Sequence, residues 1–318
     1  MEAVITGSRD SNWAMGNFRP RSGRQTHPTR SVSTTCKCVV LNSCGRRAGR
    51  AVRGFSMVEL AVALVIIAIL LGSILVPLNT QVESRKYDET QRVLERARDA
   101  LLGFVAANGR FPCPACASGT DPTCGTGVED LADLNNGICG GDVSAPPVYI
   151  GFLPATTLGL TGVDSAGFAV DAWGLPQNRI RYAVSSATVT ITRPFTKPNG
   201  MRTAGMSSIA GATTLLYVCN SAAGVTTSDC GTAGTLASSV PVVIWSVGPN
   251  STTTGGASND ERQNPNPDPT SAGPVVDRIF VSKTKSGGPG DPNEFDDIVT
   301  WIGAPTLFNR LIAAGQLP

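Results

Sequence analysis

The chain has 318 residues, which is enough for one sizeable globular domain beside any membrane segment. Its net charge of +2 at pH 7 leaves no electrostatic footprint for nucleic acid, so we expect no nucleic-acid partner. The single histidine, His27, lies near the N-terminus. The chain beyond it can therefore hold neither a histidine-based catalytic triad nor a histidine-ligated metal.

Residues 1–54 show no apolar periodicity and are rich in Arg, Ser, Thr and Gly. Such a composition cannot bury enough apolar surface to form a core. We expect residues 1–54 to be a cytoplasmic leader that is removed. An alternative is that part of it is never made, with translation starting downstream, for instance at Met15.

An uncharged apolar run covers residues 60–78 and follows four closely spaced arginines: Arg46, Arg47, Arg50 and Arg53. About 20 apolar residues are enough to span a hydrocarbon core of roughly 30 Å. We therefore expect a transmembrane helix over residues 55–82, with its N-terminal side in the cytoplasm and the rest of the chain on the other side of the membrane. A secretory signal peptide fits less well, because the run is long and no small-residue cleavage site follows it.

Glu59 is a lone carboxylate at the start of this apolar run. A charged side chain costs about 2.5–3.5 kcal/mol at the bilayer centre, and less near an interface. Glu59 therefore requires a partner of opposite charge, which a plain single-pass anchor does not supply. Cleavage after Gly54 would create one, the amine of Phe55.

The string Arg53-Gly54-Phe55-Ser56-Met57-Val58-Glu59-Leu60 resembles the type IV prepilin signal of type IV pilins and type II secretion pseudopilins. The resemblance implies that a prepilin peptidase/methyltransferase cuts between Gly54 and Phe55 and then N-methylates Phe55. It implies that Glu59 acts in assembly by neutralising the N-terminus of a neighbouring pilin or pseudopilin subunit. It also implies that Pro77 kinks the helix.

We expect the helix to continue as an amphipathic segment over residues 83–108 and to carry a globular head, residues 109–318. The face toward the head is predicted by apolar residues at helical spacing: Leu94, Ala97, Leu101 and Val105. Asn108-Gly109 is typical of a helix C-terminus.

Six cysteines follow the apolar run: Cys113, Cys116, Cys124, Cys139, Cys219 and Cys230. An even number of cysteines outside the cytoplasm predicts structural disulfides. We expect Cys219 to pair with Cys230, whereas the first four allow three pairings. A zinc cluster, or a redox motif at Cys113 and Cys116, is the alternative; prolines at 112 and 114 argue against the redox helix.

Residues 109–170 are dense in Gly, Pro, Asn and Asp and are expected to be loops. Alternating β-branched segments then predict an antiparallel sheet of four to five strands: 179–184, 188–193, 213–219, 240–247 and 276–282. The first two should form a hairpin. Residues 295–301 predict a last strand or the lead-in to a helix over 305–314. The predicted fold class is α+β, with a long N-terminal helix, membrane-spanning in its first half, packed on a small antiparallel head.

Three head segments resemble the major pseudopilin in the same order: Asp171-Ala-Trp-Gly-Leu-Pro176, Ile244-Trp-Ser-Val-Gly-Pro249, and Asp297-Ile298 with Trp301. This resemblance implies a pilin-like head.

The resemblance also implies a calcium site in the loop after the glycine turn. Here that turn, Gly248-Pro249-Asn250-Ser251, lacks one acidic ligand, so Asp260 and Glu261 further along are the calcium candidates. A solvated polar loop is the alternative. We expect the adjacent Asp296 and Asp297 to serve structure or helix capping.

The sequence shows no catalytic constellation, so we expect no enzyme activity and no cofactor apart from the calcium candidate. The predicted function is a structural subunit of a type IV pilus or type II secretion pseudopilus. The large, cysteine-rich head favours a minor subunit. The alternative is a membrane-anchored periplasmic binding domain that does not polymerise.

Overall fold

The computed structural model describes residues 54–116, 124–140, 148–174, 178–250, 258–264, 278–288 and 291–317, and of residues 73–80 it describes only the backbone. The chain divides into two units, Met1–Glu59 and Leu60–Pro318. The predicted leader lies outside the described residues except for Gly54, so its removal and the translation start stay predictions.

A single helix, α1, covers Met57–Asn108. It ends where Gly109 adopts a φ of 65°, a left-handed conformation that glycine takes without steric cost, and donates its N–H to the carbonyl of Val105 at 2.8 Å. The predicted helix and its C-terminal end are confirmed.

None of the helices in the described part of the chain is both long enough and apolar enough to cross a membrane. This finding does not support the transmembrane helix that we predicted over residues 55–82. Of the predicted apolar run, side chains are described only as far as Gly72.

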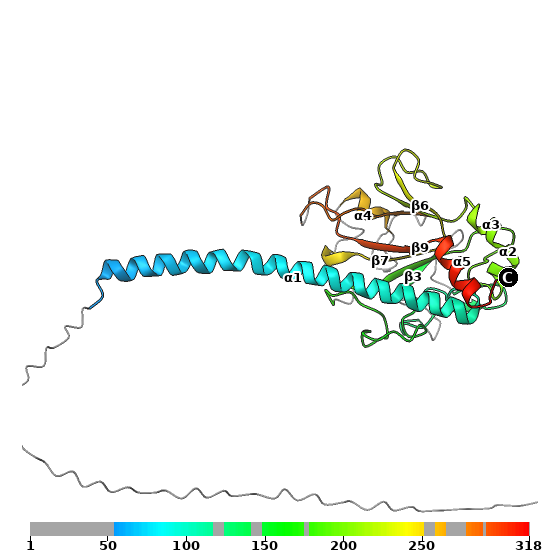
Figure 1. Ribbon diagram of the computed structural model, residues 1–318, viewed down its shortest axis with the longest axis horizontal. Helices are drawn as coiled ribbons and strands as arrows, with labels where there is room; N and C mark the ends of the chain where they lie inside the picture. The colour runs from blue at the N-terminus through cyan, green and yellow to red at the C-terminus, as the bar shows by residue number, and fades with distance from the viewer. Residues whose placement is uncertain are drawn as a thin grey trace, which may run out of the picture. The chain divides into compact units, whose positions relative to one another are not determined.

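The C-terminal half of α1 packs on the head through the predicted apolar stripe (Figure 1). All four residues of the stripe are at most 2 % exposed: Leu94, Ala97, Leu101 and Val105. The mixed helix and antiparallel sheet that the sequence predicts are therefore present.

The central sheet is antiparallel and has the order β3-β4-β7-β9. Its strands are β3 (Val148–Phe152), β4 (Arg181–Ser185), β7 (Val242–Ser246) and β9 (Ile298–Ile302). Side chains alternate between its two faces. Tyr182 and Val184 of β4 point into the core under α1, whereas Ala183 points into a second core on the opposite face.

A three-stranded sheet, order β6-β5-β8, covers that opposite face. Its strands are β6 (Thr235–Val240), β5 (Leu216–Cys219) and β8 (Ile279–Val281). Strands β5 and β8 run parallel, which the prediction of one antiparallel sheet did not anticipate. The two sheets meet at Trp245 and Phe280, whose rings pack edge to face with centroids 5.1 Å apart.

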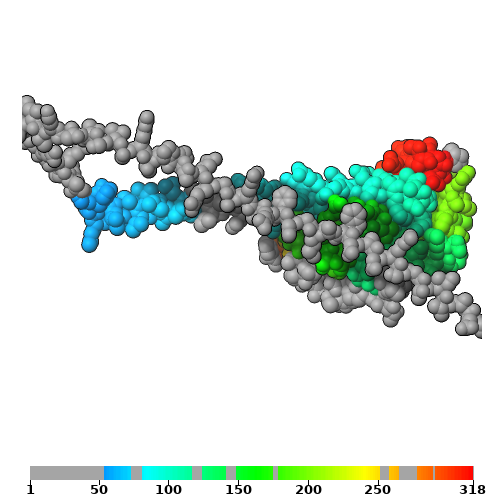
Figure 2. Space-filling model, turned by 90° about the horizontal axis from the view of Figure 1, so that it is seen from below, coloured from blue at the N-terminus to red at the C-terminus, as the bar shows by residue number. Residues whose placement is uncertain are grey.

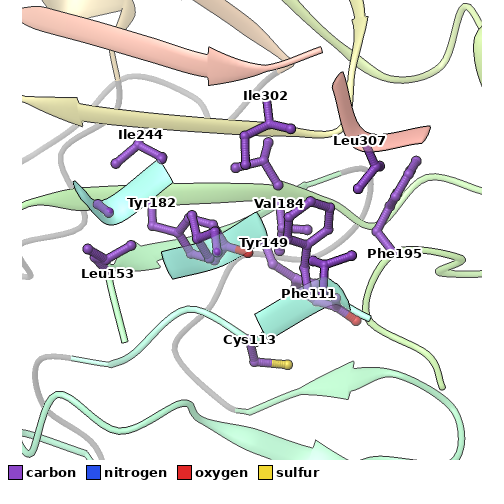
Figure 3. Close-up of a cluster of buried hydrophobic side chains, with 14 of the residues drawn as sticks. Phe111, Cys113, Tyr149, Leu153, Tyr182, Val184, Phe195, Ile244, Ile302 and Leu307 are labelled. Carbon is purple, nitrogen blue, oxygen red and sulfur yellow. The ribbon is translucent and has the colours of Figure 1, made fainter. Parts of the chain in front are cut away.

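The core beneath α1 contains side chains from the central sheet and from other segments of the head (Figure 3). Ile244 and Ile302 lie over Tyr182 and Val184, and Phe111 directly after α1 closes the same cluster. The Tyr182 hydroxyl donates to the carbonyl of Pro112 at 3.0 Å, so this buried polar group is satisfied.

Two sequence predictions about the head are wrong. Residues 188–193 form no strand, because β4 is already flanked by β3 and β7 and has no free edge for a hairpin partner. Residues 109–170 are not all loops, because they contain β1 (Leu131–Asp133), β2 (Ile138–Cys139) and the fully buried β3. A five-residue buried strand is too short to stand out against the glycine-rich background.

The last helix, α5 (Ala304–Ala313), lies beside the final turns of α1 (Figures 1 and 2). Leu307 and Leu311 enter the core under α1, and the Gln316 side chain donates to the carbonyl of Ala106 at 3.1 Å. The predicted helix over 305–314 is confirmed. The short remaining elements are α2 (Gly200–Ala204), α3 (Met206–Ala210), η2 (Gly248–Asn250) and α4 (Asn259–Gln263).

Candidate functional site

The predicted cleavage point lies just before α1. Gly54, Phe55 and Ser56 have no regular secondary structure and are exposed. A Cβ atom built on Gly54 meets nothing within 4 Å. The Gly54–Phe55 bond is thus sterically open to a peptidase.

Glu59 lies exposed in the first turn of α1. Its backbone N–H donates to the Ser56 hydroxyl at 3.3 Å, which makes Ser56 the N-cap of the helix. An acidic side chain in this turn is also favoured by the helix dipole. The Ser-x-x-Glu spacing therefore has a second explanation, a helix cap, beside the assembly role that the resemblance implies.

The first turns of α1 expose a continuous apolar surface. Twelve large apolar residues in these turns or directly before them are each at least 50 % exposed: Phe55, Met57, Val58, Leu60, Val62, Leu64, Val65, Ile66, Ile67, Ile69, Leu70 and Leu71. An exposed apolar patch of this kind marks a surface that binds protein or lipid. Pro77 lies within α1, but its side chain is outside the description, so the kink stays a prediction.

The six head cysteines form three disulfides: Cys113–Cys139, Cys116–Cys124 and Cys219–Cys230. The predicted structural disulfides and the predicted pairing of Cys219 with Cys230 are confirmed. Cys113 and Cys116 have different partners, so they do not form a redox pair with each other. The grouping of Cys116 and Cys124 with Asp130 does not fit a metal ion, because both sulfurs are already bonded.

Three buried carboxyl groups in the described part of the head form an acidic cluster: Glu261, Asp296 and Asp297. One oxygen of each lies within 4.8 Å of the others, and none of the three residues is more than 3 % exposed. Glu261 comes from α4, and the two aspartates directly precede β9.

Local hydrogen bonds fix the position of Glu261 in the acidic cluster. Ser258 caps α4 and receives the Glu261 N–H at 3.2 Å, which closes a capping box. The Glu261 carboxylate accepts from the backbone N–H of Asp296 at 3.0 Å. It also accepts from the Asn250 amide at 3.2 and 3.1 Å.

The two aspartates are unequally satisfied. Asp297 accepts from the Asn264 amide at 2.7 Å. Oδ1 of Asp296 is buried and has no hydrogen-bond partner within the residues that the structure describes. A buried acceptor without a donor is costly, so this oxygen calls for a cation or a proton.

The raised pKa values of the two aspartates also indicate that the acidic cluster requires a proton or a cation. Burial, reinforced by the carboxylates of Asp297, Glu261 and Glu294, raises the pKa of Asp296 to about 8. Burial also raises the pKa of Asp297 to about 7, although the Asn264 hydrogen bond opposes the shift. Neighbouring carboxylates in a low dielectric cannot all ionise unless a positive charge joins them.

Gly248 makes the close approach of the acidic cluster to the sheet possible. It has a φ of 65°, and an added Cβ would lie 2.6 Å from Oδ1 of Asp296. The Asn178 amide donates to the Gly248 carbonyl at 2.7 Å and to Asp171 at 2.9 Å, and Ser246 donates to Asp171 at 2.6 Å. The described parts of the three segments that resemble the major pseudopilin thus lie together.

Asp260, the other calcium candidate, lies outside the acidic cluster. Its carboxylate is paired with Lys283 and accepts from the N–H of Ala222 at 2.7 Å. Of the two calcium candidates, only Glu261 therefore belongs to the acidic cluster. From the sequence we predicted a structural or capping role for Asp296 and Asp297. They are far from Glu261 in the sequence, so the sequence gives no sign that the three carboxyl groups form one cluster.

The acidic cluster fits a hard cation such as Ca²⁺, which prefers several oxygen ligands including carboxylates. Glu261, Asp296 and Asp297 are the residues that would hold it. The unpartnered oxygen of Asp296 is the observation that favours this fit.

Comparison with known families gives one match. Residues 49–75 match the family model for the prokaryotic N-terminal methylation motif. The chain therefore carries the type IV prepilin and pseudopilin signal, which confirms the resemblance stated from the sequence. A search of curated proteins and a search of solved structures each found no match.

The motif supports a type IV pilin-like or pseudopilin protein and implies processing by prepilin peptidase and assembly with other pilin subunits. It covers the start of α1 and none of the head.

Proposed function

We propose that the protein is a structural subunit, of the minor kind, in a type IV pilus or a type II secretion pseudopilus. It is held in the inner membrane by the apolar start of α1, with the head in the periplasm, and enters the filament after cleavage and methylation. Its role is assembly, without enzymatic chemistry of its own.

The observation that carries this proposal is the position of the methylation motif on α1. The motif covers the exposed apolar residues described at the start of α1, and the same helix continues into the core of the head. A filament subunit needs this division: an apolar stem that packs with other stems and a head that folds independently of them. The cysteine-rich head supports the minor role.

Replacing Gly54 with valine is expected to block processing in cells. A Cβ atom added at this point meets nothing within 4 Å, so the block would report recognition by the peptidase and not misfolding. Mass spectrometry of the purified protein measures the result. The original chain should begin at N-methylated Phe55, and Gly54→Val should keep its leader.

The matched control is Gly45→Val, upstream of the motif, which should be processed normally. A protein that keeps its leader with Gly54 intact contradicts the proposal. The alternative, a periplasmic binding domain that never polymerises, predicts a membrane-held protein that is absent from sheared filaments.

We propose as a second function that the acidic cluster binds Ca²⁺ and so stabilises the joint between α4 and β9. Support comes from three buried carboxylates and one unpartnered oxygen. Structural calcium sites of extracytoplasmic modules bind with dissociation constants of roughly 0.1–1 mM.

Calorimetric titration of the full chain in a nonionic detergent, after treatment with a chelator, should show saturable calcium binding. Asp297→Asn should weaken it at least about tenfold, because a charged ligand is lost. Asp260→Asn should leave the affinity unchanged, because Asp260 pairs with Lys283. No heat above dilution at millimolar calcium would end the proposal.

A further inference from the structure

The head has an open pocket of about 520 Å³ whose lining includes no member of the acidic cluster. Its volume lies within the range of about 300–1,000 Å³ that is usual for small-molecule sites. Among the residues that the structure describes, the lining combines two arginines, Arg193 and Arg278, with six serine and threonine side chains and no acidic residue. This composition selects for a negatively charged group with several oxygen atoms.

Each guanidinium group is held by a hydrogen bond and keeps donors that no other described residue uses. Nε of Arg193 donates to the Tyr149 hydroxyl at 2.9 Å, and Nη1 of Arg278 donates to the carbonyl of Thr213 at 3.0 Å. Across the described ranges, neither arginine has a carboxylate within salt-bridge distance. A guanidinium has five N–H donors, so each side chain can still bind an oxyanion.

One described carboxylate, that of Asp229, interacts electrostatically with Arg278. Arg278 contributes to lowering the pKa of Asp229, although hydrogen bonds from Thr226 and Gly231 dominate that shift. The Asp229 carboxylate accepts from the Thr226 hydroxyl at 2.8 Å and from the Gly231 N–H at 2.9 Å. Asp229 therefore offsets part of the charge of Arg278 and leaves that of Arg193.

Ser186 gives an independent sign of a ligand. It lines the pocket and is 3 % exposed, but its hydroxyl has no hydrogen-bond partner among the described residues. Folding leaves such a group unpaired only at a cost in free energy. An oxygen-rich ligand in the pocket would accept from this hydroxyl.

The backbone conformation of Arg193 also supports a binding role for this residue. Its φ is 52°, a left-handed conformation that residues other than glycine seldom adopt. Residues in such conformations gather at binding sites, where the surrounding structure holds them. The segment that we predicted as a hairpin strand, 188–193, thus provides a wall of this pocket.

We propose that the pocket binds a phosphate or sulfate group carried by a small, hydroxyl-bearing molecule. A guanidinium fork matches the geometry of phosphate and sulfate oxygens, and the lining offers two of them. In this proposal the surrounding hydroxyls, including that of Ser186, pair with the remaining oxygens and with the rest of the ligand.

Calorimetry on the full chain in a nonionic detergent tests this with three probes: glucose 6-phosphate, inorganic phosphate and glucose. We expect saturable binding of glucose 6-phosphate, weaker binding of phosphate and none of glucose. If inorganic phosphate bound as tightly as glucose 6-phosphate, the pocket would recognise only the oxyanion, and the proposal of a hydroxyl-bearing ligand would be overturned. Glucose binding as tightly as its phosphate would overturn the oxyanion site.

Arg193→Gln and Arg278→Gln should each weaken glucose 6-phosphate binding roughly tenfold, because each removes a charge-assisted contact. Arg202→Gln, an exposed arginine of α2 outside the pocket, should bind like the original chain. Ser186→Ala should weaken binding a few-fold while the melting temperature does not fall, since its hydroxyl has no described partner to lose. The proposal would be overturned if the original chain showed no saturable binding at about 10 mM ester, or if both pocket arginine variants bound the ester as tightly as the original chain.

Discussion

Replacing Glu59 with glutamine is expected to remove the protein from filaments while leaving the head folded. Removing one partner of a buried ion pair costs about 3–5 kcal/mol, which lowers incorporation more than a hundredfold. The Ser56 cap uses the backbone N–H of residue 59, and glutamine suits the third helical position of a cap as glutamate does, so α1 should keep its start. Immunoblotting of sheared filaments against the cell fraction measures the effect.

The choice of glutamine separates charge from capping. If Glu59 serves only as a helix cap, Glu59→Gln assembles normally and Glu59→Ala does not. Glu95→Gln is the matched control, because Glu95 is an exposed glutamate of the same helix. It should assemble like the original chain. Full incorporation of Glu59→Gln would refute the ion-pair role.

The calcium-free protein is expected to lose stability as pH rises from about 4 to 8. The folded state raises the pKa of Asp296 to about 8 and that of Asp297 to about 7, from an ordinary 3.8. Between these values the folded chain binds more protons than the unfolded chain, so stability falls with pH. Each pKa unit corresponds to about 1.4 kcal/mol for one group. Thermal unfolding with a chelator at several pH values measures the fall.

Calcium should remove most of this fall, because the cation replaces the protons that the acidic cluster otherwise binds. The double variant Asp296→Asn/Asp297→Asn should show a smaller pH dependence and no response to calcium. A residual slope is expected from Asp171, whose pKa burial also raises. Asp99→Asn, on an exposed part of α1, should behave like the original chain. A calcium-free protein that is equally stable at pH 5 and pH 8 would contradict the prediction.

Local features of the fold were predictable from the sequence. The stripe from Leu94 to Val105 identified the buried face of α1, because helical periodicity depends only on neighbouring turns. The Asn108-Gly109 pair identified its end for the same reason. The hairpin at 188–193 failed because β-branched alternation carries no information about whether a strand edge is free.

The candidate sites also differ in how far the sequence predicted them, because some are formed by neighbouring residues and others by residues far apart in the sequence. The processing motif is contiguous, so its residues could be named from the sequence. The acidic cluster brings Glu261 to residues 296 and 297 through the folding of α4 against the start of β9, and of these three residues only Glu261 was predicted to bind calcium. The pocket at Arg193 and Arg278 was missed entirely, because its residues are far apart in sequence and share no spacing.

The end of α1 has a mechanical consequence. Five residues after the helix ends at Asn108, Cys113 is joined covalently to Cys139, and the last turns of the helix are held in the core of the head. A pulling force applied along the helix would reach this cross-link almost at once. The tension would then divide between two stretches of chain, and the head would resist extraction of its own stem without relying on apolar packing alone.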